Sequence, residues 1–355
     1  RTWAAWKVSW GVEAYQATMG DTNALTMESV SAFRSALKVC TKDSLPADWA
    51  MTQNHLGTAL MLLGQRAGSD ENLWESVSAF RRALEVRTKE LLPVFWAATQ
   101  ISIAGVLLRL GMRSGSDENL LESVSACDKA LEVYTKEAHP ADWAMTLHVL
   151  GTVLQVLGER SGSDEKLLES VSAYRRVLEV RTKDSMPAEW AMTQNNLGAV
   201  LRKIGWRSGS EEFLMESVSA FSRALEVRTK ESLPSQWATT QNNLGIVLGI
   251  LGERSGSIEK HQAAVSAFCS ALSVHTKEAH PTDWAMTQGN LAGALCKIGQ
   301  LTGSPEKLEE SLAAWRRSFE VYTEDCHPAF WAATKWGLAD TLLVLGSRKA
   351  ISSSV

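Results

Sequence analysis

The chain has 355 residues and a net charge of −4, with 45% apolar and 21% charged residues. These values are typical of a soluble folded protein, and without a basic excess we expect no nucleic-acid partner bound through its phosphates. The longest apolar runs cover only a few residues, such as 59–63, so we expect no membrane-spanning segment and no membrane partner.

The N-terminal segment begins RTWAAW, without an initiator Met or a visible secretion signal. We expect a fragment or processed product in which residues 1–45 form a partial repeat with a helix around Trp3. The cysteines are odd in number and none forms a C-x-x-C pair. Free thiols in a reducing compartment are therefore expected, which favours the cytoplasm. They are Cys40, Cys127, Cys269, Cys296 and Cys326.

A period of 47 residues dominates the chain, which indicates a repeat architecture. Seven prolines mark it, and a tryptophan stands three residues after each. The prolines are Pro46, Pro93, Pro140, Pro187, Pro234, Pro281 and Pro328. Full repeats are predicted to start at 46, 93, 140, 187, 234 and 281. A terminal helix at 328–346 and a polar tail at 347–355 follow, and the whole of 1–355 is predicted to be one domain.

The first half of each repeat has a helical pattern, which we call helix A. It begins at the proline, a residue suited to the first turn of a helix. In the first full copy, Trp49, Leu56 and Leu60 lie on one helical face. We expect Gly64 and the residues after it to end the helix. Each tryptophan is predicted to be a wedge in the core between repeats rather than part of an aromatic ligand cage.

The second half of each repeat has another helical pattern, helix B. Ser69 or Asp70 can cap its start, where acidic residues also suit the positive end of the helix dipole. Its apolar stripe consists of Leu73, Val77, Phe80 and Leu84. Charged residues from 81 to 90, Arg87 among them, are predicted to lie mostly on solvated faces. The next Leu-Pro is expected to end the stretch.

No alternating pattern of a β-strand competes with these helices. The sequence therefore predicts an all-α, right-handed superhelical solenoid of antiparallel helix hairpins, with about 15 helices. A small residue stands in the middle of every helix A, where Gly costs about 1 kcal/mol relative to Ala. We infer that two helices approach closely at these positions. The small residues are Gly57, Ala104, Gly151, Gly198, Gly245, Ala292 and Ala339.

Two strings carry a family resemblance. NLGAVLRKIG places Leu197, Gly198, Leu201 and Gly205, and ESVSAFSRALEV places Phe221, at offsets found in the tetratricopeptide repeat. The chain therefore resembles that family, and RALEVRTKESLPSQWATTQNNLG is similar to the longer repeats of kinesin light chain. The repeat departs from the usual length of about 34 residues, and its Trp precedes the Leu by seven residues rather than three.

No catalytic constellation stands out. The histidines lack an H-E-x-x-H or paired Cys/His context, and the recurring R-S-G-S-D-E loop lacks the lysine and the preceding strand of a phosphate-binding loop. Its acidic residues do not have the spacing of a calcium-binding loop. We therefore expect no enzyme, no cofactor and no metal site, and histidines that are structural or solvated.

The resemblance implies that helix A lines a concave face and that its T-Q-N-N segment faces a groove. Asn side chains can pair with both the N–H and the C=O of an extended peptide. The alternative is that these side chains bond within and between repeats and rigidify the array. The candidate peptide-binding residues are Asn54, Gln194, Asn195, Asn196, Arg202, Gln241, Asn242, Asn243 and Asn290. Lys is absent from the Asn54-type positions, which disfavours a clamp for chaperone tails.

Two positions of helix A vary between copies, as expected of a groove specialised along its length or of indifferent surface. The first is Thr58, Gly105, Thr152, Ala199, Ile246, Gly293 and Asp340. The second is Met61, Leu108, Gln155, Arg202, Gly249, Cys296 and Leu343.

The sequence is compatible with two functions. The first is a non-catalytic interaction scaffold that binds a peptide or protein on the concave helix-A face. The alternative is a structural array whose uncapped terminal repeats associate end to end into fibres or rings, with copies of the chain as partners.

Overall fold

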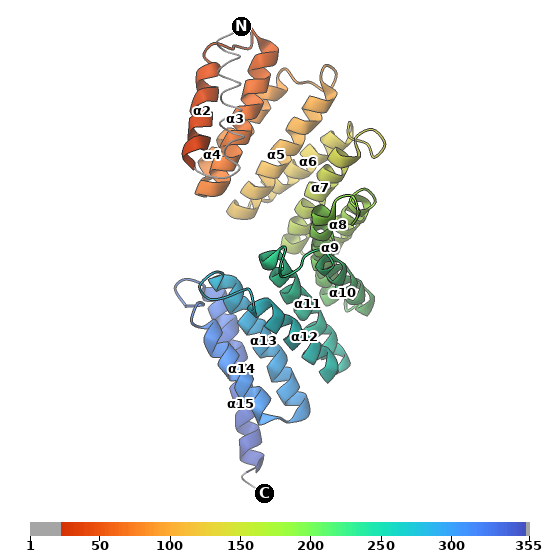
Figure 1. The fold of residues 1–355 in the computed structure, drawn as a ribbon, viewed down its shortest axis with the longest axis vertical. Coiled ribbons are helices and arrows are strands. Elements are labelled where there is room, and N and C mark those ends of the chain that lie inside the picture. Colours follow the sequence, from red (N-terminus) through yellow and green to blue (C-terminus); the bar gives the residue numbers. More distant parts are fainter. Residues whose placement is uncertain (1–22, 353–355) are drawn as a thin grey trace. The chain divides into compact units, whose positions relative to one another are not determined.

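The computed structural model describes residues 23–352, and within them it has fourteen helices and no strand (Figure 1). The expected helix around Trp3 and the last three residues of the expected polar tail lie outside the described residues. The described helices confirm the all-α repeat architecture, and their number agrees with the expected count of about 15.

The chain divides after Val180 into two compact units, each of which is described here by itself. The first holds α2 (Asn23–Ala36), α3 (Pro46–Ala67), α4 (Asp70–Leu84), α5 (Pro93–Ser114), α6 (Asp117–Leu131), α7 (Pro140–Ser161) and α8 (Asp164–Leu178). The second holds α9 (Pro187–Ser208), α10 (Glu211–Leu225), α11 (Pro234–Ser255), α12 (Ile258–Leu272), α13 (Pro281–Thr302), α14 (Pro305–Ser318) and α15 (Pro328–Ser352). Helix α15 continues six residues beyond the predicted end at 346, where Arg348 donates a hydrogen bond to the Gln300 carbonyl of α13 at 2.8 Å.

Odd-numbered helices are the A helices, and each begins at its proline as predicted. The first A helix ends within the expected stretch, at Gly68 rather than at Gly64: α3 runs to Ala67, and Gly68 has a φ of 67°. That left-handed backbone strongly favours glycine. Close packing, rather than backbone conformation, requires glycine at position 64, because a Cβ there would lie 2.8 Å from the side chain of Leu73.

Even-numbered helices are the B helices, and serine caps confirm their predicted starts. Ser69, for example, accepts a hydrogen bond from the Asn72 backbone N–H at 3.3 Å. The expected end at Leu-Pro is wrong, because α4 stops at Leu84 and a turn-rich loop leads to Pro93.

Arg87 lies in that loop and is only 8% exposed, so the prediction of a solvated side chain is also wrong. The loop folds back, and the guanidinium lies over the Phe95 ring at 5.1 Å and donates to Thr99 Oγ1 at 3.3 Å. Burial lowers the pKa of Arg87. This arginine therefore joins the end of one repeat to helix A of the next.

Within each unit, every A helix packs against the B helices before and after it, and successive A helices also touch each other. Among the described helices of each unit, successive B helices make no such contact. The A helices therefore lie on the more tightly stacked side of each unit.

The close approach predicted at the small residues of helix A is confirmed. A Cβ at Gly57 would lie 2.8 Å from Phe80, and one at Gly245 would lie 2.6 Å from Phe268. Where helix A carries Ala104, the facing residue is the smaller Cys127, and both side chains are buried. Residue size is thus matched between the paired helices in these three copies.

The repeat tryptophans are less buried than predicted. Trp143 is 6% exposed, whereas the other six are half-buried. They stand in the first turn of helix A, at the edge of the stack, where cations reach them: the Arg176 guanidinium lies 5.0 Å from the Trp143 ring. The six half-buried rings cover the edge of the core, whereas Trp143 belongs to a buried cluster with Tyr134 and Val177.

Polar contacts repeat from one copy to the next. The Arg113 guanidinium donates to the Gly68 carbonyl of the preceding helix end, and Arg254 donates to the carbonyl of Gly205 at 3.0 Å. Exposed Lys–Glu ion pairs form a second series. They are Lys42–Glu85, Lys89–Glu132, Lys136–Glu179, Lys183–Glu226 and Lys277–Glu320.

Helix α5 is long and apolar enough to cross a membrane by length and composition alone, which the short apolar runs did not suggest. Half of its most apolar window is buried inside the structure. A core helix of a repeat stack meets the same criterion, and α5 packs with α4 and α6.

Candidate functional site

The candidate residues on helix A lie between repeats as well as at the surface. In the first unit, Asn54 Oδ1 accepts from Thr99 Oγ1 of the next repeat at 3.1 Å. In the second unit, Asn195 Oδ1 accepts from Thr240 in the same way at 3.1 Å. These contacts are the ones that the alternative of a rigidified array describes.

The remaining candidates differ in how far they are buried. Gln194 is buried, and its Oε1 has no hydrogen-bond partner among the described residues. Asn242 is buried too and accepts from the amide of Asn290 at 3.0 Å. The half-buried ones are Asn196, Arg202, Gln241, Asn243 and Asn290. In the second unit the structure thus brings Asn242 and Asn290 together on neighbouring A helices.

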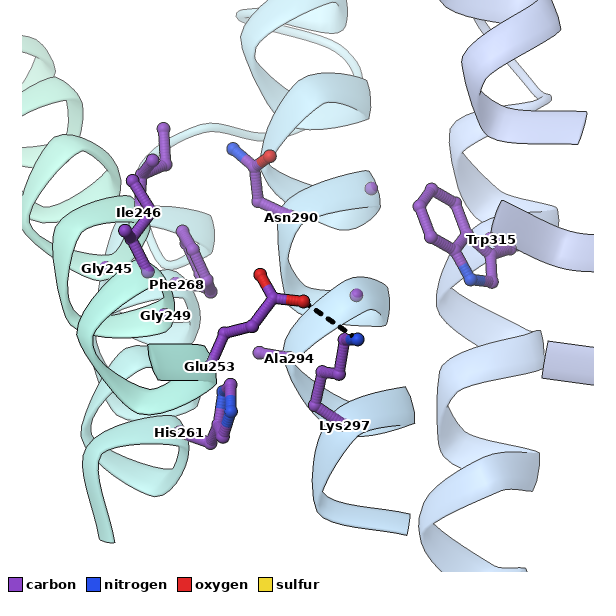
Figure 2. Close-up of a pocket in the computed structure, with 13 residues that line it drawn as sticks. Gly245, Ile246, Gly249, Glu253, His261, Phe268, Asn290, Ala294, Lys297 and Trp315 are labelled. Carbon is purple, nitrogen blue, oxygen red and sulfur yellow. Dashed lines mark ion pairs between the residues drawn. The ribbon is translucent and has the colours of Figure 1, made fainter. Parts of the chain in front are cut away.

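A hollow of about 310 Å³ lies between α11 and α13 in the second unit (Figure 2). We call it the glycine hollow, because Gly245, Gly249, Gly289 and Gly293 line it. Ile246, Ile250, Glu253, His261, Phe268, Asn290, Ala294, Lys297 and Trp315 complete the lining. Most of these side chains are apolar, and the polar ones stand at defined points, as is usual for a ligand site.

Two of the four glycines are not needed for packing. A Cβ at Gly249 or Gly293 would meet nothing within 4 Å, in contrast to Gly245, whose Cβ would collide with Phe268. A glycine inside a helix costs about 1 kcal/mol relative to alanine. At these two positions no helix contact requires that cost, and the missing side chains are what leaves the hollow open.

His261 on α12 contributes a buried polar group to the wall. The side chain is 2% exposed, and Nδ1 has no hydrogen-bond partner among the described residues. An unpaired buried polar group costs about 1–3 kcal/mol. Burial lowers the pKa of His261, so the ring is neutral at pH 7. It then carries one N–H donor and one acceptor nitrogen.

An ion pair crosses one end of the hollow. Glu253 reaches from α11 to Lys297 on α13, with 2.9 Å between Oε1 and Nζ (Figure 2). The hydrogen bond with Glu253 raises the pKa of Lys297. Because the two charges neutralise each other, the hollow itself has no strong preference for a charged ligand.

A second hollow of similar volume adjoins the first and shares Ile246, Gly289, Asn290 and Trp315 with it. Its further lining includes Met286 of α13 and Phe330 of α15. The two hollows together follow the A helices of three successive repeats. Asn290 uses one amide N–H for Asn242, and its second N–H and its carbonyl oxygen give it capacity for a ligand at the shared boundary.

Sequence reasoning did not assign the Glu253–Lys297 pair, Trp315 or His261 to a site. One signal for His261 was present in the repeat. In five of the six other B helices the equivalent residue is leucine, and in α2 it is Thr26. The leucines are Leu73, Leu120, Leu167, Leu214 and Leu308. Gly249 and Gly293 fall on the two variable positions, but without a structure open space could not be distinguished from close packing.

Among residues 24–348, no three His, Cys, Asp or Glu side chains lie close enough together to hold a metal ion. The described cysteines are all free, and burial raises the pKa of Cys127 to about 12. A thiol with such a pKa is a poor nucleophile at neutral pH.

Neither the comparison with protein-family models nor the one with curated proteins gives a match. Solved structures do match. The C-terminal part of a TPR repeat-containing protein from Cytophaga hutchinsonii has a TM-score of 0.54 at 10% identity, over 93% of this chain and 99% of that one. The APC/C hetero-tetramer Cut9-Hcn1 has a TM-score of 0.50 at 13% identity, over 89% of this chain and 52% of the matched one. At these identities the similarity establishes the fold alone.

Proposed function

We propose that this chain, whose fold is that of the tetratricopeptide repeat, is a non-catalytic interaction scaffold that binds an extended peptide on its helix-A face. The observation that carries the proposal is the pair of adjoining hollows along α11, α13 and α15, which share Asn290. Side chains of a peptide would enter the hollows, and the Asn290 amide would pair with its backbone.

The apolar lining supports this assignment over a catalytic one. An extended peptide gains affinity from main-chain hydrogen bonds and specificity from pockets for its side chains. The hollows supply pockets, whereas the nearest charged groups, Glu253 and Lys297, are paired with each other. Gln241 and Asn243 lie on the same helix A as Gly249 and are further candidates for backbone contacts.

The test uses the full chain and a library of twelve-residue peptides, with binding measured by fluorescence anisotropy. Saturable binding is expected, and Asn290→Ala should weaken it about tenfold, the effect of losing one or two hydrogen bonds. Lys183→Gln, in an exposed ion pair with Glu226 away from the hollows, is the matched control and should bind as the parent does. Failure of every peptide to saturate would refute the proposal.

Self-assembly is the second candidate, and the surface of α15 favours it. Trp336 is 74% exposed and Leu343 is 73% exposed on this helix. Large apolar side chains that are exposed on one helix can mark a protein interface. If copies associate through α15, light scattering should show a mass that rises with concentration. Trp336→Glu together with Leu343→Glu should then restore the monomer, whereas a constant monomer mass would exclude this candidate.

A further inference from the structure

The glycine hollow has the size and lining of a pocket for one aromatic side chain. Its volume is about 310 Å³, and an apolar cavity of about 150 Å³ already holds a benzene ring. Ile246, Ile250 and Phe268 supply apolar walls, and Trp315 supplies an aromatic one. A ring can lie against Gly249 and Gly293, because no side chain stands between it and the helix backbone there.

Other copies of the repeat do not offer the same space. At the position of Gly249 they carry Met61, Leu108, Gln155, Arg202, Cys296 and Leu343. At the position of Gly293 only one other copy has glycine, Gly105. The two glycines face the hollow from neighbouring helices, α11 and α13, so the opening is specific to this pair of repeats.

His261 adds a polar requirement to this apolar pocket. In five other copies a leucine at this position packs against a glycine near the end of helix A, as Leu73 does against Gly64. His261 keeps that contact, since a Cβ at Gly252 would lie 3.0 Å from its ring. The substitution therefore keeps the packing and adds a buried nitrogen without a partner among the described residues. A ligand that offers a hydrogen-bonding group beside an apolar ring would satisfy the imidazole.

We propose that the glycine hollow binds one tryptophan or tyrosine side chain of the partner peptide, with its indole N–H or phenol O–H hydrogen-bonded to the imidazole of His261. That the partner is a peptide rests on the proposed function. The pocket and its binding chemistry are inferred independently, from the residues that line the hollow. Phenylalanine fits the apolar walls and leaves His261 unpaired, so the pocket discriminates against it.

The experiment titrates N-acetyl-tryptophanamide, N-acetyl-tyrosinamide and N-acetyl-phenylalaninamide into the full chain. The readout is the ring NMR signal of His261 in histidine-labelled protein, assigned with His261→Leu. We expect saturable shifts with millimolar dissociation constants for the first two, as is usual for ligands of this size. Binding of the phenylalanine compound should be about tenfold weaker, the effect of one hydrogen bond.

Three variants make the test specific. Gly249→Leu and, from the opposite helix, Gly293→Leu fill the hollow and should abolish the shifts, while circular dichroism confirms that they fold. Gly105→Leu, equally open but in the first unit, is the matched control and should leave the shifts intact. His261→Leu restores the leucine of the other copies, and ligand-observed NMR should show that it loses the preference for tryptophan and tyrosine over phenylalanine.

The outcomes separate this inference from the proposed function. Absence of a saturable His261 shift with N-acetyl-tryptophanamide, or an unchanged shift in folded Gly249→Leu, overturns the aromatic pocket even if library peptides bind. Saturable, His261-dependent binding of the amides supports the pocket even if no library peptide binds, a result that would count against the peptide scaffold alone.

Discussion

Two glycines one turn apart on α11 should respond differently to the same substitution. Alanine at either position gains about 1 kcal/mol of helix propensity. At Gly249 the new methyl group meets nothing within 4 Å, so Gly249→Ala should stabilise the fold by about that amount. At Gly245 the methyl would stand 2.6 Å from the ring of Phe268, which is 2% exposed and cannot swing away. Overpacking of this kind costs about 1–3 kcal/mol, so Gly245→Ala should be neutral or destabilising by up to about 2 kcal/mol.

The second repeat shows how the collision can be relieved, because it combines Ala104 with Cys127 at the equivalent positions. Phe268→Cys alone removes a buried ring and should cost about 3–5 kcal/mol, as other large-to-small core changes do. Combined with Gly245→Ala, it should show a favourable coupling of about 1–3 kcal/mol in a double-mutant cycle.

Urea unfolding of the four proteins, followed by circular dichroism, measures these free energies. Size matching between Gly245 and Phe268 fails as an explanation if Gly245→Ala and Gly249→Ala shift the urea midpoint equally. It also fails if the effects of Gly245→Ala and Phe268→Cys are simply additive.

Three further predictions concern the frame of the repeat. Ser210→Ala removes the side chain that accepts a hydrogen bond from the Phe213 backbone N–H at 3.4 Å, and it should lower the free energy of unfolding by about 1 kcal/mol. Ser210→Gly should lower it by only a few tenths of a kcal/mol. Urea titration measures both changes. Arg254→Leu loses a charge-assisted bond to the Gly205 carbonyl at 3.0 Å and should cost about 1–3 kcal/mol; a melting temperature equal to the parent's would contradict this. The folded pKa of His261 lies below the ordinary 6.5, so only the unfolded chain takes up this proton as pH falls below about 6.5. The contribution of His261 to the free energy of unfolding should therefore be constant above that pH and fall below it. His261→Leu should flatten the decline in melting temperature between pH 7 and 5.

The site was only partly predictable, since the physics that decides it acts between repeats. The T-Q-N-N pattern drew attention to helix A, but it did not reveal that Asn54 and Asn195 bond to a threonine of the next repeat. Nor could it tell a glycine that admits a neighbouring ring, such as Gly245, from one that faces open space, such as Gly249. Both positions are glycine in the sequence, and they differ only in the residues that surround them in the folded chain.

The sequence by itself determined the period, the start of each A helix at proline, the serine caps of the B helices and the need for small residues in the middle of helix A. Each of these depends on residues close in the chain or on a repeat of the same local pattern. The similarity of the repeat to kinesin light chain stays a prediction from that pattern. Tertiary structure alone decided the rest: that the Arg87 loop folds back, that six of the seven repeat tryptophans are half-buried, and that α11 and α13 leave a hollow between them. The physical reason is that burial is a property of two repeats in contact, and a single repeat does not contain that information.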